Sequence, residues 1–166
     1  MKEKIPIAVS ACLLGHRVRY DGEEKANNFI LTELSRKFAI ISLCPETGIG
    51  MPVPRPPIQL NRVKDKIQAQ TIHPPHHNYS EELRQYAQKL IPYLSNIAGY
   101  VFKARSPSCG VGTTPLRNET VNGIFAHDLL SAFPQMPIID ESLLETKEQQ
   151  VLFIDRINQF YRNHCL

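Results

Sequence analysis

The chain has 166 residues, of which 42% are hydrophobic and 21% are charged. These proportions are those of ordinary globular proteins and exclude a disordered chain, and the length suffices for one domain, residues 1–166, with a buried core. The net charge of +3 and the scattered Lys and Arg residues do not predict a duplex nucleic-acid binder, although tRNA stays open as a partner. A small anionic ligand suits this charge better.

The first ten residues, MKEKIPIAVS, contain a short apolar run interrupted by Pro6. Such a run is neither a signal peptide nor a membrane span, so we expect a cytoplasmic protein without a membrane partner. In a reducing compartment, the four cysteines of the chain are expected to be thiols, metal ligands or redox groups rather than structural disulfides.

Short β-rich runs alternate with amphipathic stretches, a pattern typical of α/β proteins. We predict a single Rossmann-like three-layer domain with a mostly parallel sheet and helices on both faces. In chain order, the expected elements are strand 5–10, helix 23–38, strand 39–43, helix 81–90 with Ser80 as its N-cap, strand 100–104, helix 125–133, strand 137–140 and helix 145–164. The proline-rich segment 45–57 predicts a rigid extended loop, and residues 62–72 an edge strand or short hairpin.

Three of the cysteines, Cys12, Cys44 and Cys109, each follow the carboxyl end of a predicted strand. In an open parallel sheet these ends face one crevice, which is the usual place for a ligand. A single cysteine is most often a small buried hydrophobe, and this remains the alternative for each of the three. Their occurrence at successive strand ends, in loops rich in Gly and Pro, indicates a shared site instead.

Three thiolates suit soft metals such as zinc, copper(I) or an iron–sulfur cluster. A structural zinc site usually has four ligands with short Cys-x-x-Cys spacing, which this sequence lacks. A four-iron cluster on three thiolates leaves one iron open, and such an iron is a soft Lewis acid suited to the sulfur atom of a substrate.

Three segments closely resemble the signatures of the thiouracil desulfidase family: residues 10–22 (SACLLGHRVRYDG), 44–57 (CPETGIGMPVPRPP) and 103–112 (KARSPSCGVG). Residues 123–125 (GIF) and 141–144 add to the resemblance, which spans nearly the whole chain. The resemblance implies a Rossmann-like domain that removes sulfur from thiouracil- or thiouridine-type pyrimidines, giving the oxo-pyrimidine and hydrogen sulfide.

The resemblance also implies a [4Fe-4S] cluster with Cys12, Cys44 and Cys109 as its ligands and one open iron, and it implies Glu46 and Ser106 as the catalytic acid/base pair. Protein handled in air is expected to lose this cluster, because such centres oxidise easily. The implied partner is a small thiolated pyrimidine. The sequence does not specify whether it is a free base, a nucleoside, a nucleotide or part of tRNA, nor the oligomeric state.

The residues themselves suggest the same chemistry. Water must attack the thiocarbonyl carbon while sulfur leaves, and a carboxylate near the metal is the natural group to take and return protons. Glu46 lies two residues after Cys44 and fits this role, the alternative being a solvated loop carboxylate. Ser106 and Ser108 flank Pro107, where serines also commonly stabilise turns, so the preference for Ser106 as the catalytic serine rests on the family pattern.

Four residues are candidates for binding the substrate: Asp21, Arg55, Lys103 and Ser108. Arg55 lies in a loop stiffened by prolines, where its guanidinium group suits a phosphate or a ring carbonyl. A salt bridge that fastens the loop is the alternative role for Arg55. Lys103 is a candidate of the same kind at a strand end, and Asp21 is equally typical of a turn.

Two segments depart from the family pattern. Residues 73–80 (HPPHHNYS) replace a longer family segment that contains an Asp-x-Thr element, and residues 113–122 predict a loop of different shape. The three histidines of the first segment alternate with prolines, which is more typical of a mobile loop than of a metal site. Cys165, next to the C-terminus, is interpreted as a bystander.

Two other functions compete with a desulfidase. One is a thiol redox or persulfide-handling protein in which Cys12 and Cys44 cycle through a disulfide. The other is an iron–sulfur or zinc sensor that binds a partner. The visible spectrum of protein purified without oxygen distinguishes an iron–sulfur protein from a colourless zinc protein.

Overall fold

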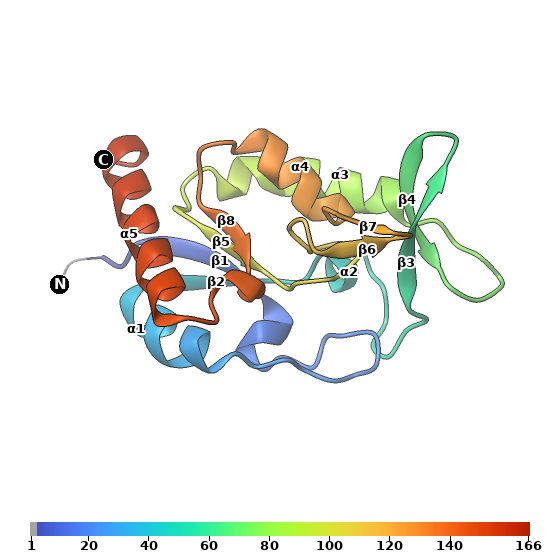
Figure 1. Cartoon of the computed structure of the whole chain (residues 1–166), viewed down its shortest axis with the longest axis horizontal. Coiled ribbons are helices and arrows are strands. Elements are labelled where there is room, and N and C mark those ends of the chain that lie inside the picture. Colours follow the sequence, from blue (N-terminus) through green and yellow to red (C-terminus); the bar gives the residue numbers. More distant parts are fainter. Residues whose placement is uncertain (1–2) are drawn as a thin grey trace.

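Four parallel strands form the central sheet of the protein, in the order β2-β1-β5-β8 (Figure 1). This is a computed structural model, and it describes residues 3–166. The strands are β1 (Pro6–Ser10), β2 (Ala39–Leu43), β5 (Tyr100–Phe102) and β8 (Ile138–Asp140). All three pairings in this sheet are parallel, so the predicted α/β class with a mostly parallel sheet is confirmed.

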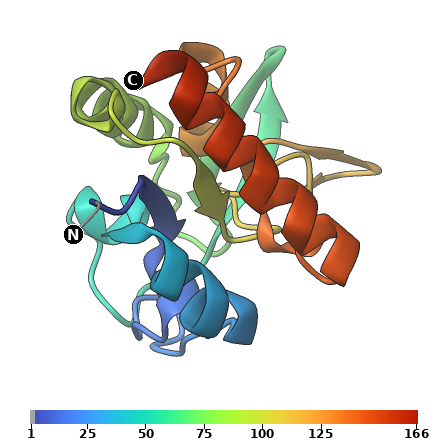
Figure 2. The same cartoon turned by 90° about the vertical axis from the view of Figure 1, so that its left-hand side faces the viewer.

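Helices cover both faces of the sheet, as the sequence pattern predicts (Figures 1 and 2). Alternate residues of the strands point to opposite faces, so Val9 and Val101 pack on one side and Ala8 and Phe102 on the other. The first side is covered by residues 30–37 and by α5 (Lys147–His164), and the second by α3 (Ser80–Leu90) and α4 (Ile124–Ala132). Within residues 3–166, no helix is both long and apolar enough to span a membrane.

The first helix starts later than the predicted residue 23. It begins at Asn28, continues as a π-helical stretch, Ile30–Leu34, and leads into α1 (Ser35–Lys37). The preceding residues 23–27 are not helical, because their backbone is already bonded elsewhere: the amides of Lys25 and Asn27 donate to the carbonyls of Cys12 and Leu13. Helical spacing alone does not reveal such long-range bonds.

Ser80 is not the N-cap that its position suggests. It is the first residue of α3, and its hydroxyl accepts a hydrogen bond from the amide of Ala69 at 2.8 Å. The amide of Ser80 donates in turn to the side chain of Asn78 at 2.9 Å. Ser80 therefore joins α3 to the neighbouring hairpin.

Two antiparallel hairpins extend from the end of the molecule opposite α5 (Figure 1). The first pairs β3 (Ile58–Val63) with β4 (Lys66–Thr71), which confirms the hairpin alternative for that region. The second pairs β6 (Thr114–Leu116) with β7 (Glu119–Val121), in a segment for which the sequence predicted only a loop. Arg62 and Glu119 join the two hairpins by an ion pair of 2.7 Å.

The proline-rich loop after β2 is not extended throughout. It begins with a single helical turn, α2 (Pro45–Gly48), in which Pro45 occupies the first turn. Proline is tolerated there because the first helical amides have no acceptor inside the helix. The rest of the loop is irregular and leads to β3.

Candidate functional site: three cysteine loops around one cavity

Cys12, Cys44 and Cys109 line one cavity of about 750 Å³ at the carboxyl ends of the parallel strands. The chain leaves β1 toward β2 on one side and returns to β5 on the other, so this is the point at which the strand order reverses. All three cysteines are free thiols. The prediction that three distant strand-end loops meet at one cavity is confirmed.

Each of the first two cysteines lies in a tight turn directly after its strand. Cys12 belongs to a 3₁₀ turn, Ala11–Leu14, which ends at Gly15 with a φ of 88°. Its carbonyl accepts the amides of Gly15 and Lys25. Cys44 immediately precedes α2, where a Cβ on Gly48 would lie 2.4 Å from the ring of Tyr86, so a larger residue there would force the Tyr86 side chain to move.

The loop that carries Cys109 is held against the start of α4. The amides of Ile124 and Ala126 donate to the carbonyls of Pro107 and Ser108 at 2.9 and 3.0 Å. A Cβ on Gly123 would lie 2.4 Å from the Ser108 carbonyl carbon, so the helix can approach this closely only with glycine there. This contact gives a physical reason why residues 123–125 add to the family resemblance carried by the cysteine segments.

Burial keeps two of the thiols protonated in the cluster-free protein. Burial raises the pKa of the Cys12 thiol to about 11, while the nearby Lys103 ammonium opposes this effect. Burial and then the proximity of Cys44 raise the pKa of the Cys109 thiol well above its usual range, and a contact of 3.7 Å with the Ser108 hydroxyl opposes them. A metal must therefore displace protons to bind here.

Glu46 and Arg55 form a buried ion pair in this cavity. The Arg55 Nη2 donates to Glu46 Oε2 at 2.6 Å, and the side chains are only 2% and 14% exposed for Arg55 and Glu46 respectively. Arg55 also donates to the carbonyl of Pro52, while its buried Nε–H has no hydrogen-bond partner among residues 3–166. Both predicted roles of Arg55 are therefore compatible with its position, because it fastens the loop and keeps one donor free.

Ser106 and Ser108 stand in a chain that leads to a cysteine sulfur. Ser106 Oγ accepts the amide of Cys109 at 3.1 Å, so it stabilises a turn as serines in such loops often do. The same oxygen lies 3.1 Å from Ser108 Oγ, which lies 3.7 Å from the Cys109 sulfur. Both serines line the cavity.

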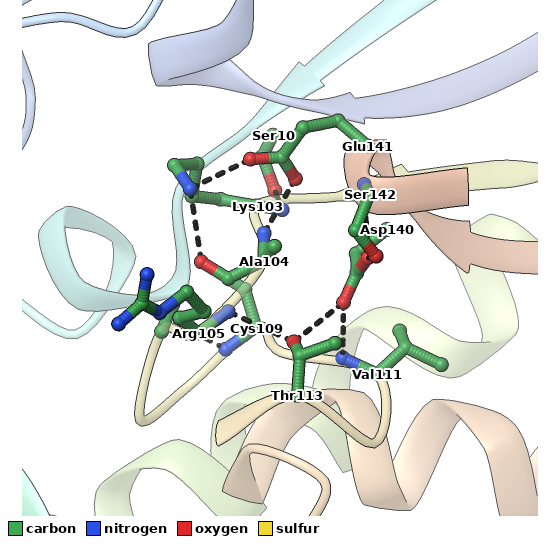
Figure 3. A network of polar contacts seen from close by, with 11 residues as sticks. Ser10, Lys103, Ala104, Arg105, Cys109, Val111, Thr113, Asp140, Glu141 and Ser142 are labelled. Atoms are coloured by element: carbon green, nitrogen blue, oxygen red, sulfur yellow. Dashed lines mark hydrogen bonds and ion pairs between the residues drawn. The ribbon is translucent and has the colours of Figure 1, made fainter. Parts of the chain in front are cut away.

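The side chains of Lys103 and Asp21, two of the residues predicted to bind the substrate, are bonded to other groups of the protein. Lys103 lines the cavity, but its ammonium group is paired with Glu141 at 2.6 Å and donates to the carbonyl of Ala104 (Figure 3). Asp21 does not line the cavity. It pairs with Arg19 at 3.4 Å and accepts the amide of Glu23, which is the turn role that was its alternative.

The lining of the cavity is strongly cationic, which the sequence did not reveal. Glu46 is its only acidic residue among residues 3–166, whereas six basic residues contribute to it: Arg19, Lys25, Arg55, Lys103, Arg105 and Arg117. Arg117 lies in the turn of the second hairpin. Because the sequence predicted only a loop for this segment, it did not predict that Arg117 would line the cavity. The hairpin residues Gln59 and Asn61 also line this side.

The remaining candidate metal ligands lie apart from this cavity. His76 hydrogen-bonds to the carbonyl of Thr71, and His77 lies 3.2 Å from Glu82 on the surface. Cys165 follows α5 and does not line the cavity. Within residues 3–166, no three side chains of His, Cys, Asp or Glu are grouped closely enough to ligate a single metal ion.

Residues 7–141 match the family model described as 2-thiouracil desulfurase. The chain belongs to this family. It is 30% identical over 123 residues to the uncharacterized protein YbbK of Bacillus subtilis strain 168, which covers 70% of this chain and 80% of YbbK. It is also similar to the solved structure of a [4Fe-4S]-dependent thiouracil desulfidase, TudS, with a TM-score of 0.65 and 28% identity over 92% of this chain and 99% of that one.

The donor set of this 2-thiouracil desulfurase family member fits an iron–sulfur cluster. Three thiols and no other soft ligands line the cavity, and thiolates are the ligands that such clusters prefer. Tyr100 does not line the cavity, but burial and then the nearby Cys109 and Cys44 raise the pKa of its hydroxyl; it is 0% exposed, and its hydroxyl has no hydrogen-bond partner among residues 3–166. A buried hydroxyl without a partner is rare, and a bound group rich in sulfur would supply an acceptor.

Proposed function

We propose that this protein removes sulfur from thiouracil- or thiouridine-type pyrimidines, with a [4Fe-4S] cluster held by Cys12, Cys44 and Cys109. The observation that carries this proposal is the meeting of three free thiols and a buried Glu–Arg pair at one cavity. Membership of the 2-thiouracil desulfurase family supports the substrate class. The bound cluster would supply one open iron, a soft Lewis acid able to accept the sulfur that leaves.

The reaction is a hydrolysis and needs no outside reductant. Water adds its oxygen to the thiocarbonyl carbon, the carbon–sulfur bond breaks, and both protons of the water end on the released hydrogen sulfide. Two protons must therefore leave the oxygen, and two must reach the leaving sulfur. A residue that takes a proton from the oxygen and gives it to the sulfur can perform each of these transfers.

Glu46 is the residue best arranged for this proton transfer. Its Oε2 is occupied by Arg55 at 2.6 Å, and its Oε1 has no hydrogen-bond partner among residues 3–166, so Oε1 is available to a water molecule. The ion pair fixes the carboxylate, since Arg55 is itself held by the carbonyl of Pro52. The unpaired Nε–H of Arg55 is itself buried, so a ring carbonyl or a phosphate could accept from it only if the surrounding loop opened.

Ser106 is proposed as the partner of Glu46. Its oxygen already accepts the amide of Cys109, so its hydroxyl proton remains available to donate to the substrate or to Ser108. A serine in this position can deliver a proton beside the sulfur ligand Cys109 and recover it from Glu46 or water. The turn that Ser106 stabilises and its proton transfer are compatible, because they use different parts of the hydroxyl group.

The experiment is anaerobic reconstitution with iron and sulfide, followed by an assay of hydrogen sulfide release from 2-thiouracil, 4-thiouridine and their nucleotides. We expect a brown protein whose turnover requires the cluster. Cys165→Ser is the matched control for the cysteine variants, since Cys165 lies outside the cavity. A colourless zinc protein, or a protein that releases no sulfide from any of these compounds, would contradict the proposal.

A further inference from the structure

Strand β8 ends at Asp140, and Glu141 directly follows it; neither carboxylate lines the cavity. Asp140 is 1% exposed, and both side chains are directed at the loop that carries Cys109 (Figure 3). The loop comprises residues 103–113 and has no strand or helix of its own. Besides the bond from the amide of Lys103 to the hydroxyl of Ser10 in β1, the bonds to Asp140 and Glu141 connect this loop to the end of the sheet.

Asp140 uses both carboxylate oxygens. Its Oδ2 accepts the amide of Val111 at 3.1 Å and the hydroxyl of Thr113 at 2.6 Å. Its Oδ1 accepts the amide and the hydroxyl of Ser142. A carboxylate with this many donors is strongly fixed, because hydrogen bonds to an ionised acceptor are about twice as strong as neutral ones.

Thr113 links Asp140 to the other end of the loop. Its Oγ1 accepts the amide of Arg105 at 2.9 Å while donating to Asp140. Arg105 has a φ of 65°, a left-handed conformation that is unfavourable for residues other than glycine and needs support from its surroundings. Glu141 adds a second anchor there, since it accepts the amide of Ala104 and pairs with Lys103.

We propose that Asp140 and Glu141 are positioning residues that hold both ends of the loop 103–113, and so keep Cys109 at the cavity before any cluster binds. This inference rests on the proposed ligand role of Cys109. A loop ordered in advance loses less conformational freedom when the ligand arrives, so the cluster is bound more tightly and released more slowly. The contacts that order a metal ligand commonly matter almost as much as the ligand itself.

The test uses the cluster-free protein, so that it does not depend on activity. Thr113→Val keeps the shape of the side chain but removes the link between Asp140 and Arg105, and Thr113→Ser restores the hydroxyl. Thr120→Val, at an exposed position of β7, is the matched control. Asp140→Asn is a second variant at the other end of the link. Each protein is treated with iodoacetamide, and the alkylation rate of each cysteine is measured by mass spectrometry.

Cys109 is 5% exposed and Cys12 is 7% exposed, so both need a local opening to react, and Cys12 serves as the internal reference. We expect Thr113→Val to speed the alkylation of Cys109 about tenfold or more, the effect of losing a hydrogen bond to a buried charged group. The Cys12 rate should change less than about twofold, Thr113→Ser should restore the wild-type rate, and Thr120→Val should have no effect. Iron loss to a chelator should accelerate in the same order among the variants.

An unchanged Cys109 rate in Thr113→Val would overturn the proposal. An equal acceleration of Cys109 and Cys12 would also overturn it, because it would indicate a general loss of stability rather than a freed loop. If Asp140→Asn does not fold, the Thr113 variants still decide the result. A wild-type protein that takes up no cluster, but shows the expected alkylation pattern, would refute the proposed function and leave the anchorage of the loop supported.

Discussion

The replacement Glu46→Gln tests the most exposed step of the proposed mechanism. Glutamine keeps the size of Glu46 and an oxygen for Arg55, but it loses the negative charge and cannot take a proton from water. We expect the cluster to remain and turnover to fall by roughly a hundredfold or more, which is typical of losing a general acid/base. Sulfide release and iron content are measured on the same reconstituted sample.

The structure also gives the effect of this change on stability. Arg55 is 2% exposed and its bond to Glu46 measures 2.6 Å, so water solvates its guanidinium group very little. Arg55 stays charged in this variant, and a buried charge that loses its counter-charge costs up to about 3–5 kcal/mol. Glu46→Gln should therefore lower the free energy of unfolding by up to this amount, measured by urea titration of the cluster-free protein.

A matched control exists on the surface of the same protein. Glu119 pairs with Arg62 at 2.7 Å, but these side chains are 56% and 40% exposed. Glu119→Gln should change the free energy of unfolding by no more than about 0.5 kcal/mol, because water screens such pairs, and it should leave turnover unchanged. The Glu119–Arg62 pair thus has almost the same geometry as the Glu46–Arg55 pair, but it is exposed to solvent.

Two results would refute the reasoning about Glu46. Normal turnover by Glu46→Gln with its cluster intact would show that Glu46 is only the counter-ion that holds Arg55 in its loop. Loss of iron in parallel with turnover would show that the pair acts by supporting the Cys44 loop, since Glu46 belongs to the turn that follows Cys44. Only retained iron with lost turnover supports the proton-transfer role.

Three further predictions concern the surroundings of Glu46. Replacing Cys12, Cys44 or Cys109 by Ser should lower iron content and activity together, because a hydroxyl is a hard ligand for a soft metal centre, whereas Cys165→Ser should change neither quantity. Tyr100→Phe should leave the free energy of unfolding of the cluster-free protein unchanged or raise it by up to about 1 kcal/mol, because it removes a buried hydroxyl that has no partner among residues 3–166. A clear decrease of this free energy in urea titration would mean that the hydroxyl has a hydrogen-bond partner. Arg105→Gln should lower the catalytic efficiency for a thiolated nucleotide about tenfold and leave that for the free base unchanged, and an equal effect on both substrates would rule out a phosphate contact by Arg105.

The central sheet and the meeting of the cysteines were predictable from the sequence. Strands such as Ala39–Leu43 are short apolar runs with turn residues at their ends, and a parallel sheet brings its carboxyl ends to one edge whatever the length of the connections. Strand-end position therefore identified Cys12, Cys44 and Cys109 without knowledge of their contacts. The same rule also applies to Asp140 and Glu141 at the end of β8, where the sequence analysis did not use it.

Features that depend on contacts between distant segments were not predictable. The start of the first helix depends on carbonyls of the Cys12 turn, and the hydroxyl of Ser80 is taken by Ala69 of a neighbouring strand. The pairing of Glu46 with Arg55 needed the fold of the proline-rich loop, although both residues had been selected separately. The hairpin 114–121, which brings Arg117 to the cavity, has strands of only three residues and thus a weak pattern.

The charges around the cavity connect the cluster with the substrate. Three of the six basic residues that line it are paired, with Asp21, Glu46 and Glu141, while Lys25, Arg105 and Arg117 have no ion-pair partner within residues 3–166. This leaves the cavity with a net positive charge. Burial keeps the pKa of the Cys12 thiol above its usual value, although Lys103 and Arg19 lower it. A cluster with three thiolate ligands is anionic, and so is the sulfide that leaves. The same positive charge therefore favours cluster binding, departure of sulfur and capture of a substrate that carries a phosphate. In Arg105→Gln, the iron content and the turnover of the free base report the first two effects, and the turnover of the nucleotide relative to the free base reports the third.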